Sequence, residues 1–177
     1  RLGVAIRHNG SLVLMNGNEI GAVLLDFLCA VEHKEGRGVG DRVVVTTIVS
    51  APIVDAMAQD YGFELRRTLT GFKYIGEQIG ILEDEGQKDR FLFGFEESYG
   101  YLVGSYVRDK DAMVAAMLLC QAVSWYQNRG LDLIDVLDSL YARYGYQKTA
   151  LMTCSYPGAG GIQRMEKIMC DLRKTPP

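Results

Sequence analysis

Two adjacent glutamates end an apolar run in the segment GFEES, residues 94–98. Carboxylates that directly follow a buried strand are costly to bury without partners, so Glu96 and Glu97 require hydrogen-bonding groups nearby. A carboxylate can accept from two vicinal hydroxyl groups, and the hydroxyl of Ser98 can donate or accept. This pattern is typical of a loop that binds sugar hydroxyls.

The two glutamates are not expected to act as a catalytic pair. Glycoside hydrolysis uses two carboxylates, but these flank the scissile bond from opposite sides. Adjacent residues such as Glu96 and Glu97 point in different directions when the chain is extended. We therefore expect one of them to be structural and to pair with Arg108 or Lys110.

Two other loops at strand ends offer groups that bind anions. Residues 70–73 (TGFK) combine a hydroxyl from Thr70 and a cation from Lys73 around a glycine that permits a tight turn. Residues 46–50 (TTIVS) carry hydroxyls at a strand-to-helix junction, where helix amides can bind an anion. For TGFK, a solvated turn is an equally open alternative to anion binding. For TTIVS, the residues favour helix capping by Ser50 over anion binding.

Charged residues precede a long apolar helix in the segment RDKD, residues 108–111. The cations Arg108 and Lys110 could hold a phosphate ester there. Taken alone, the residues favour the other interpretation, a solvated helix start that Asp111 caps.

The sequence lacks the usual patterns of nucleotide-binding and metal-binding sites. Residues 36–40 (GRGVG) precede a strand instead of following one, and residues 157–161 (PGAGG) lack the Lys-Ser/Thr ending of a P-loop. The histidines, His8 and His33, are far apart, and no cysteine pair has C-x-x-C spacing. We expect no metal site from these residues. The cysteines, expected to be reduced and mostly buried, are Cys29, Cys120, Cys154 and Cys170.

Charge and hydropathy exclude two further classes of partner. The net charge is −3 and the isoelectric point is near 5.4, which argues against a nucleic-acid module with a basic face. The longest unbroken apolar run, residues 112–120, is about half of the ~18 residues that a membrane span needs. We expect a soluble, cytoplasmic protein.

The elements that must position these loops alternate between strands and helices. Apolar strands in such an alternation predict a layered α/β/α domain, in which a mixed sheet is flanked by helices, with a C-terminal helical extension. Function is then expected in the loops beyond the carboxyl ends of the strands. Asn9-Gly10 is expected as a hairpin turn, and Asn18 and Ser50 are expected as helix caps. The predicted strands are residues 2–6, 12–15, 42–49, 63–69, 91–95 and 146–154, and the predicted helices are 19–31, 52–61, 72–81, 112–129, 132–144 and 162–172.

The chain begins with Arg1 in a strand pattern and ends in Thr-Pro-Pro, where a linker would be expected. A native chain rarely begins in the middle of a strand. We expect this sequence to be part of a larger protein.

Five segments together resemble the α-D-phosphohexomutase superfamily, and most closely its phosphoglucomutase branch, including the phosphoglucomutase/phosphopentomutase type. Members have four domains, a phosphoserine, and a magnesium ion held by an Asp-x-Asp-x-Asp-Arg loop. They move a phosphoryl group between the 1- and 6-positions of a hexose through a bisphosphate intermediate. The segments occur in family order over nearly the whole chain: residues 1–5 (RLGVA), 16–21 (NGNEIG), 70–73 (TGFK), 94–98 (GFEES) and 108–111 (RDKD).

The resemblance implies a division of the chain and a set of site residues. Residues 1–17 would end the metal-loop domain, 18–130 would form the sugar-binding third domain, and 131–177 would lead toward a C-terminal phosphate-binding domain. The metal-binding aspartates would precede Arg1, so no metal ligand is expected in the chain. Lys73 would be an electrostatic or proton-transfer helper. The residues that would contact the sugar or its phosphates are Arg1, Thr70, Glu96, Ser98 and Lys110, with Glu96 and Ser98 on the sugar hydroxyls.

The implied function is an isomerase, itself a phosphoprotein, that interconverts hexose 1-phosphate and 6-phosphate, with glucose as the expected sugar. The full-length enzyme would use Mg²⁺ and glucose 1,6-bisphosphate, and its partners would be a sugar phosphate and the remaining domains of the same polypeptide, with no nucleic acid and no membrane. The 177-residue chain alone is expected to fold and to be inactive. The alternative is a non-catalytic carbohydrate- or phosphate-binding α/β domain.

Overall fold

A computed structural model describes residues 1–150 and 152–176. The chain divides into two compact units, Arg1–Gln147 and Lys148–Pro177. The second unit carries α6 (Ala159–Lys174), which contains the helix predicted over residues 162–172. The first unit contains β1 (Val4–His8), β2 (Ser11–Met15), α1 (Gly17–Lys34), β3 (Val43–Thr47), α2 (Ile53–Tyr61), β4 (Glu64–Thr68), α3 (Phe72–Asp84), the 3₁₀ helix η1 (Lys88–Arg90), β5 (Phe91–Glu96), β6 (Gly100–Val103), α4 (Ala112–Gln127) and α5 (Leu133–Tyr144).

The main sheet has the strand order β4–β3–β5–β6. β3 pairs in parallel with both β4 and β5, and β6 pairs antiparallel with β5. The predicted mixed sheet flanked by helices is therefore confirmed. The sequence pattern does not predict β6, because Gly100–Val103 is a short run that opens with glycine.

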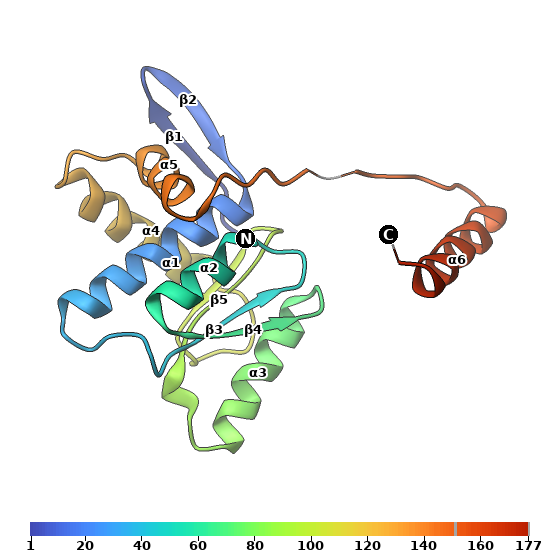
Figure 1. Cartoon of the computed structure of the whole chain (residues 1–177), viewed down its shortest axis with the longest axis horizontal. Helices are drawn as coiled ribbons and strands as arrows, with labels where there is room; N and C mark the ends of the chain where they lie inside the picture. Colours follow the sequence, from blue (N-terminus) through green and yellow to red (C-terminus); the bar gives the residue numbers. More distant parts are fainter. Residues whose placement is uncertain (151, 177) are drawn as a thin grey trace. The chain divides into compact units, whose positions relative to one another are not determined.

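Helices cover both faces of this sheet. Along β3 the side chains alternate, so Val44 packs in the larger core with α1 and α2, while Val43 and Val45 pack in the smaller core with α3. Figure 1 shows α1 and α2 on one side of the strands and α3 on the other. Burial on both faces explains why β3 is a continuous run of apolar and β-branched residues.

The start of α1 differs from the prediction. Asn16 is the N-cap: its side chain accepts from the amides of Asn18 and Glu19, and the Glu19 carboxylate accepts from the Asn16 amide. The predicted cap, Asn18, is wrong, because it lies in the first turn and its Oδ1 accepts from the Ala51 amide at 3.0 Å. A buried asparagine thus joins α1 to the loop after β3.

One predicted strand is too long and another is wrong. β3 ends at Thr47 because the chain turns there, with the Ser50 amide donating to the Thr47 carbonyl at 3.1 Å. Ile48 and Val49 are therefore exposed instead of lying in the sheet. No strand is found in residues 146–150 and 152–154, and residue 151 lies outside the described residues.

The hairpin predicted at the start of the chain is confirmed. β1 and β2 pair antiparallel, and Asn9 and Gly10 adopt φ values of 47° and 80°. Positive φ at both central residues is what a two-residue hairpin turn requires. His8 at the end of β1 lies 2.7 Å (Nδ1) from the Oδ2 atom of Asp132, the N-cap of α5.

In the described part of the chain, no helix combines the length and apolar composition that a membrane crossing demands.

Candidate functional site

The carboxyl ends of three parallel strands meet at one edge of the sheet. β4, β3 and β5 run in the same direction, so the segments that follow Thr68, Thr47 and Glu96 emerge side by side. These segments contain the predicted TTIVS, TGFK and GFEES loops. The fold therefore gathers at a single edge the polar groups that the sequence spreads over fifty positions.

Glu96 is a buried carboxylate at this edge, with 3% of its surface exposed. Its Oε1 accepts from Nη1 of Arg1 at 3.3 Å, and the same guanidinium donates to the backbone carbonyl of Ser98. A Cβ at Gly100 would lie 2.8 Å from this Oε1, so a larger residue where β6 begins would displace the Glu96 side chain. Arg1, Glu96 and Ser98, all predicted site residues, are thus brought together.

Glu97 is the structural glutamate, but its predicted partners are wrong. Its Oε2 accepts from the hydroxyls of Thr47 and Ser50, each at 3.0 Å. Ser50, predicted as a helix cap, therefore holds this loop, and α2 begins after Pro52 without a side-chain cap. Direct contact between the ends of β3 and β5 explains the difference, because hydroxyls already lie within reach of Glu97.

The predicted partners of Glu97 are occupied elsewhere. Arg108 pairs with Glu83 on α3, and Lys110 Nζ lies 2.9 Å from Asp109 Oδ1. Both cations follow β6 and approach α3, on the other side of the strands from α1. The predicted cap of α4 is confirmed, because Asp111 Oδ1 accepts from the amides of the first turn.

The backbone of the Glu97 turn packs against the start of α1. A Cβ at Gly17 would lie only 2.0 Å from the carbonyl oxygen of Glu97, so no larger residue fits there. The Leu2 amide donates to the Tyr99 carbonyl at 3.1 Å, and the Tyr101 hydroxyl donates to the Gly17 carbonyl at 3.2 Å. Tyr99 has a φ of 66°, a left-handed conformation that costs energy in a non-glycine residue. The turn is therefore held in one shape from several sides.

Lys110 lies close to the TGFK segment. Its Nζ is 5.4 Å from the ring centroid of Phe72, the first residue of α3. A hydrogen bond from Lys110 is the largest cause that lowers the pKa of Asp109, and the charge of Arg1 adds to it. Both cations thus favour the charged form of the Asp109 carboxyl.

Thr70 and Lys73 stand apart from these contacts. Both are exposed, and Lys73 Nζ lies 4.7 Å from the ring centroid of its neighbour Tyr74. Gly71 between them has a φ of 127°, as expected for a tight turn after β4. The structure thus places Thr70 and Lys73 on the same edge of the sheet but shows no direct contact between them and Glu96 among the described residues.

Sequence reasoning missed the groups that organise this edge. Arg67 on β4 donates to the carbonyls of Thr47 and Ser50 at 2.9 and 2.7 Å, and it pairs with Asp55 at 2.6 Å. Within the Arg-Arg pair of β4, no sequence signal distinguishes Arg67 from Arg66. The sequence signal closest to this network is the hydroxyl-rich TTIVS segment, which by itself indicates a helix cap or an anion site.

One group of described residues brings possible metal ligands together: His8, Asp132 and Asp135, whose ligand atoms lie within 4.8 Å of one another. The carboxylate of Asp132 accepts from the amides of Ile134 and Asp135, and that of Asp135 accepts from the Asp132 amide. These side chains cap α5. Magnesium prefers oxygen ligands, usually including waters and substrate phosphates, so this histidine-containing cap does not fit it.

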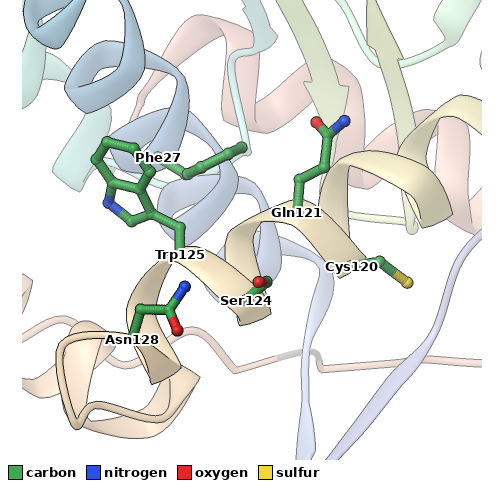
Figure 2. A pocket seen from close by; sticks show the side chains of 6 residues that line it. All are labelled: Phe27, Cys120, Gln121, Ser124, Trp125 and Asn128. Atoms are coloured by element: carbon green, nitrogen blue, oxygen red, sulfur yellow. The ribbon is translucent and has the colours of Figure 1, made fainter.

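A shallow hollow of about 450 Å³ lies away from the strand ends, between α4 and Phe27 of α1 (Figure 2). No lining side chain is charged, and the Trp125 ring at its border stacks under Arg129 at 3.8 Å. The hollow therefore offers no chemistry comparable to the Glu96 edge. Cys120, which lines the hollow, is exposed, and so are Cys154 and Cys170. The expectation of mostly buried thiols therefore holds only for Cys29. Cys120 is exposed because one side of the apolar helix α4 is left uncovered.

Comparison with known proteins gives a consistent result. Residues 16–144 match the family model described as phosphoglucomutase/phosphomannomutase, alpha/beta/alpha domain III. The chain is similar to phosphoglucomutases of Staphylococcus epidermidis (strain ATCC 35984) and Staphylococcus aureus (strain MSSA476), each 34% identical over 178 residues. These alignments cover 100% of this chain and 31% of each relative, so the chain spans about a third of their length.

Two solved structures share the fold. A Thermus thermophilus protein assigned as a phosphomannomutase superposes with a TM-score of 0.61 and 22% identity, over 81% of this chain and 29% of that one. The open form of the Paramecium phosphoprotein pp63/parafusin, a phosphoglucomutase, superposes with a TM-score of 0.56 and 18% identity. This superposition covers 80% of this chain and 23% of that one. Both likenesses support the α/β/α architecture described above.

Proposed function

This chain belongs to the phosphoglucomutase/phosphomannomutase family, as its α/β/α domain III, and from that premise we propose that it is the sugar-recognising domain of a longer phosphohexomutase. The full-length enzyme interconverts hexose 1-phosphate and hexose 6-phosphate. Glucose is the proposed sugar, because the similar curated proteins are phosphoglucomutases.

The observation that carries this proposal is the buried carboxylate of Glu96 beside Ser98 at the carboxyl edge of the sheet. One guanidinium, from Arg1, contacts both the Glu96 carboxylate and the Ser98 carbonyl. A mutase must hold its sugar in two opposite orientations, so its recognition groups must contact hydroxyls that look similar after the sugar turns over. A fixed carboxylate next to a hydroxyl meets this requirement, because it can accept from two vicinal hydroxyls in either orientation.

The cations around this edge are the proposed phosphate contacts. Arg1 contacts Glu96, Lys110 Nζ lies 5.4 Å from the ring centroid of Phe72, and Thr70 and Lys73 lie exposed in the TGFK segment after β4. Phosphoryl transfer depends mainly on positioning and on charge stabilisation of the transferring group. In this proposal Lys73 assists electrostatically near the reacting phosphate.

Magnesium, a phosphoserine and glucose 1,6-bisphosphate belong to the proposed activity of the full-length enzyme. Magnesium would supply charge stabilisation to the transferring phosphoryl group. The one candidate ligand group among the described residues, at His8, is committed to capping α5 and does not fit this ion. The role of this chain is therefore recognition and orientation of the sugar.

The test is conversion of glucose 1-phosphate to glucose 6-phosphate by the full-length protein with Mg²⁺ and glucose 1,6-bisphosphate. In Glu96→Ala, kcat/KM should fall by about 100-fold or more, because one or two charge-assisted hydrogen bonds of ~1.5–3 kcal/mol each are lost. Phosphorylation of the active-site serine should persist in this variant. Glu32→Ala, which removes a carboxylate that pairs with Arg37 and Arg42, is the control and should keep turnover within about twofold of wild type.

Near-normal turnover by Glu96→Ala would refute the assignment of Glu96. A wild-type protein that binds glucose 1-phosphate and never converts it would instead support the alternative, a non-catalytic carbohydrate- or phosphate-binding domain.

A further inference from the structure

The side chain and the backbone of Glu97 are both tied to the end of β3. Glu97 Oε2 lies 3.0 Å from Thr47 Oγ1 and 3.0 Å from Ser50 Oγ, and the two hydroxyl oxygens are 2.7 Å apart. The Glu97 amide also donates to Ser50 Oγ at 3.2 Å. Thr47 and Ser50 are 0% and 1% exposed, so these hydrogen bonds are shielded from competing water.

Arg67 holds the backbone that carries these two hydroxyls. Its Nη1 donates to Thr46 Oγ1 at 3.0 Å and to the Thr47 and Ser50 carbonyls at 2.9 and 2.7 Å. Asp55 pairs with the other end of the guanidinium at 2.6 Å and fixes its orientation. A charged donor that spans carbonyls on both sides of a turn restricts the turn, so the hydroxyls are presented to Glu97 in one geometry.

Glu97 stands between the two groups that the proposed function assigns to the sugar. Fixing residue 97 fixes the backbone directions of Glu96 and Ser98, and a displacement of about 1 Å at a positioned group can cost about 100-fold in rate. We propose that the side chains of Thr47, Ser50 and Glu97, here named the Glu97 anchor, position the Glu96 carboxylate for the sugar. This inference rests on the proposed function.

Three variants of the full-length enzyme probe the Glu97 anchor. Glu97→Ala removes the acceptor, and Thr47→Val with Ser50→Ala removes both donors while largely keeping their volume. In each, kcat/KM for glucose 1-phosphate should fall by about 10- to 100-fold. Glu97→Gln keeps an amide oxygen that accepts from both hydroxyls, so it should retain at least about a third of wild-type kcat/KM.

Glu32→Ala is the matched control. Glu32 is a half-buried carboxylate that accepts from Arg37 and Arg42 beside the amino end of β3, so its removal also breaks internal hydrogen bonds. It lies at the opposite edge of the sheet from Glu96. Its kcat/KM should stay within about twofold of wild type, whatever its effect on the melting temperature.

A double-mutant cycle with Glu96→Ala separates positioning from general loss of stability. If Glu97 acts through Glu96, the Glu96→Ala/Glu97→Ala enzyme should be no more than about threefold slower than Glu96→Ala alone. In the control double variant Glu32→Ala/Glu96→Ala, the fold-decrease in kcat/KM should equal the product of the fold-decreases in the two single variants. The proposal would be overturned if the fold-decrease in kcat/KM caused by Glu97→Ala were as large in the Glu96→Ala enzyme as in the wild type.

Amide hydrogen exchange over residues 96–100 gives a second measurement that does not depend on turnover. Without the Thr47 and Ser50 hydroxyls, exchange at the Glu97 amide should rise at least about tenfold, while exchange in α5 stays unchanged. Unchanged exchange at residue 97 would overturn the anchor itself. A further outcome is that the wild type converts no glucose 1-phosphate while exchange in the variant still becomes faster. That result would refute the proposed function and show that the anchor only shapes the loop.

Discussion

Glu96 and Glu97 show how neighbouring residues of one type acquire different roles. Glu96 contacts a cation, Arg1, whereas Glu97 is held by two neutral hydroxyls. A carboxylate that already accepts two buried hydroxyl hydrogen bonds has little capacity left for a ligand on the same oxygen. Glu96, whose one protein donor among the described contacts is long at 3.3 Å, can form stronger hydrogen bonds with a sugar.

Lys110→Met tests whether Lys110 contacts a phosphate or sugar oxygen. Methionine removes the ammonium that lies over the Phe72 ring and can replace it with a sulfur–aromatic contact, so the melting temperature should change by no more than a few degrees. Loss of one charge-assisted hydrogen bond should lower kcat/KM about 10- to 100-fold, mainly through KM. Lys88→Met, which removes an exposed lysine paired with Glu83, should leave kinetics unchanged. A large loss of stability with intact activity would favour a helix-start role for Lys110.

At the scale of elements, the β1–β2 hairpin is attached to the rest of its unit through its inner face and its tip. Val4 and Ile6 pack against the larger core, and His8 contacts Asp132 at the start of α5. Two strands alone are at best marginally stable in water, so these attachments decide whether the hairpin stays ordered. The hairpin also carries the chain into Asn16 and α1, which abut the Glu97 turn.

The His8–Asp132 contact should depend on pH. The hydrogen bond to Asp132 raises the pKa of His8 above its ordinary value of 6.5; burial opposes the shift, and the charges of Asp132, Asp135 and Asp138 add to it. Because the folded-state pKa is raised, the contact contributes its full stability below pH 6.5 and loses it as the pH rises through the raised pKa.

An NMR titration of the His8 ring checks this prediction, with His33→Gln used to assign the two histidines. The midpoint should lie above 6.5 in the wild type and fall in Asp132→Asn, which removes the charge but can still cap α5. A wild-type midpoint at or below 6.5 would contradict the contact.

At the scale of the whole molecule, the first unit, Arg1–Gln147, contains its own cores on both faces of the sheet. Four residues of α5 are buried, and they belong to the same core as α1. A unit of this size buries enough apolar surface to be stable by itself. The proposed function assigns metal and phosphoserine chemistry to other parts of the full-length enzyme.

The purified 177-residue chain should therefore fold without catalysing the reaction. Circular dichroism should show mixed α/β structure with cooperative unfolding, and glucose 1-phosphate should remain unconverted in the presence of Mg²⁺ and glucose 1,6-bisphosphate. The full-length enzyme, assayed in parallel, provides the positive control. Sustained turnover by the verified 177-residue chain would show that the active site has been misplaced.

Local patterns were sufficient to predict the elements and several of their ends. Apolar runs such as Phe91–Glu96 mark central strands, Asp111 and Asp132 mark helix starts, and Asn9-Gly10 marks a hairpin turn. Each of these signals depends on hydrogen bonds or sterics within a few residues, so it can be recognised from the sequence. The GFEES segment is a candidate sugar loop for a different reason, the carboxylate and hydroxyl groups that follow its apolar run.

The partners of these residues depended on the tertiary structure. Ser50 and Asn18 cap no helix because each is held by a residue more than thirty positions away, and Ser50 in turn holds Glu97. Side-chain hydroxyls, amides and carboxylates have similar affinities for many partners, so the nearest donor in space decides the pairing. Pairing β3 with both β4 and β5 brings Arg67, Ser50 and Glu97 to one edge. The sequence by itself determined the chemical groups available there, and only the sheet order decided which of them meet.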